Sequence, residues 1–220
     1  MSSATIEEGR LAVGLARKIL ETALDEPYGP DLLSSKDDPS LTRLFKEKRG
    51  VFVTLLTHPG KDLRGCIGFT GPVYPLAEAI AKAAWLAARE DYRFPPVATT
   101  EVKHLVVEVS ILGLMEPIAY KTPEDLLRQV VVGRDGLVVA GNGGNGLLLP
   151  QVPVDEGWSA EDFLRGVCMK AGLPSTAWKR PGLSFWRFSS QVFSEETPNG
   201  EVTERPLAPS TTAKDSKAKP

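Results

Sequence analysis

The spacing of apolar residues predicts an alternation of helices and strands along the chain. Apolar residues recur at helical intervals in residues 5–24, 40–48, 75–90, 123–130 and 158–171, with Ser40, Thr122 and Ser159 as expected N-caps. Alternating or β-branched and aromatic runs predict strands at residues 51–57, 63–70, 104–112, 136–140, 146–149 and 183–190.

The short connections between several of these strands indicate the fold class. Residues 51–57 and 63–70 are joined by a turn that contains Pro59-Gly60, and residues 136–140 and 146–149 by a glycine-rich turn. Hairpins make antiparallel neighbours, so we expect an α+β fold with a largely antiparallel or mixed sheet flanked by helices. Residues 198–220 are rich in Pro, Ser, Thr and Lys and predict a disordered tail after a folded body of residues 1–197.

Composition narrows the class of protein. Hydrophobic residues make up 42% of the chain, and no apolar run approaches the roughly 18–20 residues of a membrane span. A net charge of −2 argues against a general attraction to nucleic acid. Two cysteines and two histidines exclude an all-cysteine zinc site and do not fit a disulfide-stapled secreted fold, so we expect a cytoplasmic protein without a metal site.

The strand Leu63–Gly68 carries the strongest candidate chemistry. If Pro59-Gly60 is a two-residue turn, Val53 pairs with Cys66 and Leu55 with Arg64, which places Arg64 and Cys66 on the face away from the core. A guanidinium beside a thiol on that face would lower the thiol pKa. The glycines at positions 65 and 68 weaken a strand unless a ligand or other backbone comes close, so we assign both to a candidate binding site.

A second strand supplies residues that complete a catalytic set. His104, Glu108 and Ser110 share one side of residues 104–112 by alternation. If this strand neighbours Cys66, a cysteine, a histidine and a glutamate meet as nucleophile, base and orienting group. The simpler and favoured interpretation is a half-buried packing cysteine, an Arg–Glu ion pair and a surface histidine.

Two charged residues follow the alanine-rich helix. Asp91 and Arg93 lie just beyond its end, where Arg93 can hold an anionic ligand or form a structural pair with Asp91 or Glu108. The structural pair is the more common arrangement. The other cysteine, Cys168, lies on the apolar side of residues 158–171 and is expected to be core.

With these motifs in place, the sequence resembles the AMMECR domain family. The matching segments are Leu63–Gly68, Asp91–Pro96, Glu108–Ser110, Gly133–Gly136, Leu148–Val152 and Gly157-Trp158. One segment departs, because many members have Gly-x-His-Gly where this chain has Gly133-Arg134-Asp135-Gly136. The resemblance implies two interleaved subdomains, a groove near the Leu63–Gly68 motif, and an archaeal or bacterial origin. It also implies Memo-type and radical-SAM proteins as partners, and it names no activity or cofactor.

Two functions remain open from the sequence. In the first, slightly favoured, the protein is a binding module whose groove takes a small ligand or a partner segment, with Arg64 and Arg93 holding an anionic group. In the second, it is an enzyme with Cys66 as nucleophile, assisted by Arg64 and by His104 or Glu108.

Overall fold

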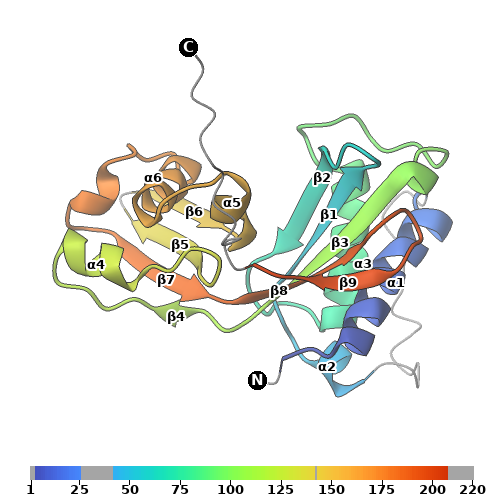
Figure 1. Cartoon of the computed structure of the whole chain (residues 1–220), viewed down its shortest axis with the longest axis horizontal. Coiled ribbons are helices and arrows are strands. Elements are labelled where there is room, and N and C mark those ends of the chain that lie inside the picture. The colour runs from blue at the N-terminus through green and yellow to red at the C-terminus, as the bar shows by residue number, and fades with distance from the viewer. Residues whose placement is uncertain (1–2, 26–41, 142, 208–220) are drawn as a thin grey trace, which may run out of the picture. The chain divides into compact units, whose positions relative to one another are not determined.

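A five-stranded antiparallel sheet forms the first of two units in the computed structural model, which describes residues 3–25, 42–141 and 143–207 (Figure 1). Its strand order is β2-β1-β3-β8-β9. The elements of this unit are β1 (Val51–Thr57), β2 (Leu63–Phe69), β3 (Leu105–Leu112), β8 (Ser190–Glu195), β9 (Val202–Arg205), α1 (Ile6–Thr22), α2 (Arg43–Lys46), α3 (Leu76–Arg89) and the 3-10 turn η2 (Val102–His104).

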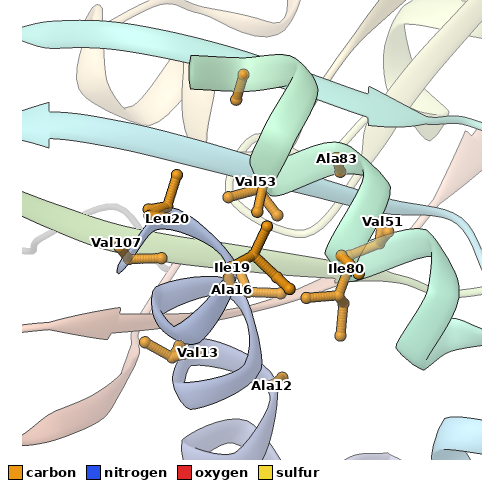
Figure 2. Close-up of a cluster of buried hydrophobic side chains, with 14 of the residues drawn as sticks. Ala12, Val13, Ala16, Ile19, Leu20, Val51, Val53, Ile80, Ala83 and Val107 are labelled. Carbon is orange, nitrogen blue, oxygen red and sulfur yellow. The ribbon is translucent and has the colours of Figure 1, made fainter. Parts of the chain in front are cut away.

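Helices α1 and α3 cover one face of this sheet. Figure 2 shows Ile19 of α1 and Ile80 of α3 meeting Val53 and Val107 of the strands, and all four are buried. The small side chains of α3 allow the close packing that its sequence predicts. Alternate residues of β1 and β3 therefore point into this core, and the intervening residues lie on the opposite face.

A buried ion pair fastens α1 to the sheet. The Arg17 guanidinium donates to both carboxylate oxygens of Glu195 on β8 and to the carbonyls of Val102 and Leu105. The same carboxylate accepts from the backbone N–H of Val107 at 3.0 Å. With its partners in place the pair is fully bonded, so removing one member leaves a buried charge without compensation.

A four-stranded antiparallel sheet in the order β4-β7-β5-β6 forms the second unit. Its elements are β4 (Glu116–Pro117), β5 (Gly136–Gly141), β6 (Gly144–Leu148), β7 (Ser184–Phe188), α4 (Pro123–Gln129), α5 (Gln151–Asp155), α6 (Ala160–Lys170) and η3 (Ala177–Lys179). Cys168 is fully buried in the core between α6 and this sheet, where the sequence places it.

The α+β fold is confirmed, and the local predictions differ in several places. Thr42 is the N-cap of α2, while Ser40, the expected N-cap, lies outside the described residues. So do Pro27, Gly29 and Pro30, which the sequence predicts as the end of the first helix. Strand β9 lies inside the segment expected to be a disordered tail, because Val202–Arg205 pairs with β8. That short strand is too polar to show an apolar pattern, so only its backbone pairing reveals it. Within the part of the chain that the structure describes, no helix is long and apolar enough to cross a membrane.

Candidate functional site

Strand β2 lies at one edge of the five-stranded sheet and carries the Leu63–Gly68 motif. Its hairpin register differs by one residue from the sequence-based prediction, since Cys66 pairs with Thr54 and Gly65 with Leu55. The turn is longer than two residues, with Thr57 N–H bonded to the Asp62 carbonyl, and a bulge follows Leu55. The predicted register places Phe52 and Leu56 of β1 on the core face, beside Leu63, Gly65 and Ile67 of β2. This is wrong for β1, because Val53 and Leu55 face the helices instead.

The expected position of Cys66 on the face away from the helices holds, and that face carries a row of polar residues. Reading across the sheet from β2 to β9, the directly paired residues are Cys66, Thr54, Glu108, Ser194 and Thr203, which we call the polar row. Thr54 and Glu108 are buried. Arg205 of β9 reaches back to Glu108, with its NH1 3.6 Å from Oε2.

The surroundings of the Cys66 thiol do not favour its thiolate form. Burial raises its pKa, and the hydrogen bond from Thr54 Oγ1 to Sγ at 3.3 Å and the charge of Arg93 lower it only in part. The negative charges of Glu108 and Asp91 raise it further. The expected net lowering of this pKa is not present, because burial is the largest influence, and the cation whose charge lowers the pKa is Arg93.

Asp91 and Arg93 form a clip over the edge of β2 at Cys66. Asp91 Oδ2 accepts from the Cys66 N–H at 2.8 Å and from Arg93 NH2 at 2.6 Å, while Oδ1 accepts from Arg93 Nε at 2.9 Å. Arg93 NH2 also donates to the Cys66 carbonyl at 3.2 Å. The Arg93 hydrogen bonds, together with the Cys66 N–H, hold the pKa of Asp91 down to about 2. The structural pairing of Arg93 with Asp91, one of the two alternatives from the sequence, is the arrangement present.

Arg64 is likewise engaged by a carboxylate. Its Nε and NH2 donate to the two carboxylate oxygens of Glu101, at 2.6 and 3.1 Å. The Phe94 ring lies within 6.0 Å of the Arg64 guanidinium carbon and 5.4 Å of that of Arg93. Both arginines therefore contact the Phe94 ring, and each is paired with a carboxylate, Arg64 with Glu101 and Arg93 with Asp91. These contacts attach the loop of residues 91–96 to the sheet.

The two motif glycines are explained by packing inside the chain. A Cβ at Gly65 would lie 2.2 Å from the Ala87 carbonyl oxygen of α3, and a Cβ at Gly68 would lie 2.2 Å from the Val51 carbonyl oxygen. Both approaches involve backbone atoms, which cannot turn away as a flexible side chain can. Close approach of backbone, the alternative to a ligand, accounts for both residues.

His104 is placed away from Cys66. It is exposed in η2, before β3 begins, and its carbonyl accepts from the His58 N–H at 3.1 Å. Four residues of extended chain, about 13 Å, separate it from the level of Glu108. Glu108 itself lies two strands from Cys66, about 10 Å between backbones. Ser110 is fully buried on the polar-row face, one row from Glu108.

Sequence reasoning missed several members of this region. Thr54 was hidden by the one-residue register error, and Glu101 and Arg205 come from segments whose contacts no local pattern encodes. Tyr92, between the two residues of the clip, is 92% exposed, and nothing in the neighbouring sequence predicts this exposure. Among the described residues, no cluster of histidine, cysteine, aspartate and glutamate has the makings of a metal site.

Comparisons with known proteins agree with the motifs. The AMMECR1 family model matches residues 13–193. Protein MJ0810 of Methanocaldococcus jannaschii is 46% identical over 92% of this chain and 98% of its own length, and a Thermococcus gammatolerans protein is 48% identical over 91% and 97%. The crystal structure of the uncharacterized protein PH0010 from Pyrococcus horikoshii matches with a TM-score of 0.80 and 45% identity, covering 90% of this chain and 96% of that one. The chain therefore belongs to the AMMECR1 family.

Proposed function

We propose that the protein is a binding module that recognises a protein partner through the loop of residues 91–96 beside the Leu63–Gly68 motif. The observation that carries this proposal is Tyr92, whose side chain is 92% exposed although its loop is held in place on both sides. Asp91 bonds the β2 backbone, and the Phe94 N–H and Val97 N–H bond the carbonyls of Asp91 and Ala88.

A fixed, exposed tyrosine is suited to binding. Tyrosine and arginine dominate the energetics of protein interfaces, and a side chain presented by an ordered loop loses little conformational freedom on binding. The charges nearby are already compensated, because Arg93 pairs with Asp91 and Arg64 with Glu101. Recognition by shape and apolar contact is therefore favoured over capture of a free anion by the two arginines.

The alternative of a Cys66 enzyme has less support. The thiol pKa is raised, and His104, the base that the sequence offered, lies on the order of 13 Å along the sheet from the Glu108 level. Glu108 sits two strands from the thiol with Thr54 between them. A nearby cation or base favours a thiolate nucleophile. The charge of Arg93 lowers the thiol pKa only in part, and neither His104 nor Glu108 is placed beside the thiol as a base.

The family resemblance supplies partner proteins for the test. We expect the purified chain to bind a Memo-type protein or a radical-SAM protein encoded in the same genome, measured by titration calorimetry. Replacing a central interface tyrosine costs about 2 kcal/mol or more, so Tyr92→Ala should weaken binding by roughly thirtyfold. Met169→Ala, at a 64% exposed position on α6, is the matched control and should bind as wild type.

The outcomes separate the parts of the proposal. If Tyr92→Ala binds as tightly as wild type, the loop is not the recognition surface. If neither candidate protein binds the wild-type chain, the partner class is wrong. If Cys66→Ser abolishes binding while Tyr92→Ala does not, the motif strand rather than the loop makes the contact.

A further inference from the structure

The outer edge of β2, where a further strand could pair, is hydrogen-bonded at Cys66 by the side chains of Asp91 and Arg93. Because Cys66 N–H and its carbonyl bond the clip, they point away from β1, and Thr54 and Cys66 form a non-hydrogen-bonded pair. Such pairs bring side chains close, which agrees with the 3.3 Å contact between Thr54 Oγ1 and Cys66 Sγ. Cys66 is thus the residue at which a further strand would exchange two hydrogen bonds with β2.

The clip reproduces that exchange. In an antiparallel hydrogen-bonded pair, one residue receives a bond at its carbonyl and gives one from its N–H. Asp91 Oδ2 takes the bond from the Cys66 N–H, and Arg93 NH2 gives the bond to the Cys66 carbonyl. A 2.6 Å bond between the same two side-chain atoms closes the ring. Charged groups placed on an edge strand are a means by which proteins prevent edge-to-edge association.

We propose that the Asp91–Arg93 clip acts as a strand surrogate that prevents β2 from pairing with β2 of a second copy of this chain. The pairing it blocks is antiparallel and two-fold symmetric, with Cys66 opposite Cys66 of the other copy and Arg64 opposite Gly68. In this register the long Arg64 side chain lies opposite Gly68 of the other copy. The outward N–H and carbonyl groups of Arg64, Cys66 and Gly68 then bond the same groups of the second strand.

The central test weakens the clip by removing its negative charge and measures self-association. Asp91→Asn removes the carboxylate charge that holds Arg93, and Asp135→Asn is the matched control. Asp135 is also buried and bonded by two nitrogens of a neighbouring arginine, Arg134, but its further bond goes to the Val131 N–H in a turn rather than to a strand edge. Sedimentation velocity gives the dimer dissociation constant, which we expect to fall at least about tenfold in Asp91→Asn and to be unchanged in Asp135→Asn.

A second readout locates the contact. Because the two Cys66 residues face one another in the blocked pairing, with Cα atoms about 5.5 Å apart, a short bismaleimide should link them in Asp91→Asn. Cys168 is fully buried and does not compete. Cys66→Ser in the same background should remove the cross-link and leave the dimer in place.

Each result bears on the proposal. A folded Asp91→Asn protein with the dissociation constant of wild type overturns it. A dimer whose Cys66 reacts with a monofunctional maleimide but cannot be cross-linked by the bismaleimide also overturns it. Equal cross-linking of the wild-type chain also overturns it, because the clip would then guard nothing. If circular dichroism shows Asp91→Asn unfolded, Arg93→Ala replaces it in the same two measurements. This variant frees the Cys66 carbonyl but leaves the Cys66 N–H donating to Asp91, so we expect a smaller fall in the dissociation constant, and an unchanged constant overturns the proposal.

Discussion

The charge on Asp91 makes a testable contribution to stability. Its side chain is 2% exposed, and four donors hold its folded-state pKa at about 2 against an ordinary value of 3.8: Nε, NH2 and the backbone N–H of Arg93, and the Cys66 N–H. Asp91→Asn keeps the shape of the side chain and one acceptor oxygen but removes the charge. The variant therefore isolates the part of the clip that depends on ionisation.

The magnitude follows from the shift in pKa. A depression from 3.8 to about 2 corresponds to roughly 2 kcal/mol of stability when the carboxyl is ionised in both the folded and unfolded chain. A lowered pKa gives stability that is complete above pH 4 and is lost as pH falls through 2. Integration of the proton linkage leaves about 1 kcal/mol at pH 3.

Urea unfolding between pH 7 and pH 3 provides the assay, at protein concentrations where both proteins are monomeric. Other acidic groups titrate alike in the two proteins and cancel in the difference. We expect the free energy of unfolding of wild type to exceed that of Asp91→Asn by about 2 kcal/mol at pH 7 and by about half as much at pH 3. A difference that stays constant across this range would refute the reasoning, because the charge of Asp91 would then contribute nothing.

Three further predictions concern single residues. Gly65→Ala should lower the free energy of unfolding by about 1–3 kcal/mol, because the new methyl group meets the backbone of α3. Gly14→Ala, in open space on α1, should raise it by about 0.5–1 kcal/mol, and thermal melts of both variants test the two expectations. Arg17→Ala should cost about 3–5 kcal/mol by leaving a buried carboxylate uncompensated, and a loss below 1 kcal/mol in urea unfolding would contradict the bonding described above. Alkylation of Cys66 by iodoacetamide should be slower than that of a free thiol at pH 7, and its rate should level off at a higher pH than that of the free thiol, since burial raises the pKa of Cys66. Fast alkylation at pH 7 would revive the enzyme hypothesis.

The sequence was informative where a property is local. The helical spacing of α1 and α3, and the alternation of β3, each follow from side chains within one segment, and all three elements form close to their expected bounds. The expected position of Cys66 on the face away from the helices holds, although the register from which it was derived is wrong by one residue. The register of the hairpin did not follow from the sequence, because a bulge after Leu55 adds a residue that no local pattern marks.

The sequence by itself determined the α+β class and the position of Cys168 in a core, because these depend on periodicity and residue type. Only the tertiary structure decided which carboxylate each arginine meets. Arg64 finds Glu101 and Arg93 finds Asp91, at an edge strand where Cys66 needs a donor and an acceptor. Pairing between residues far apart in sequence depends on how strands and loops are brought together in three dimensions. In that arrangement the backbone of Cys66, the candidate nucleophile, bonds the loop that exposes Tyr92.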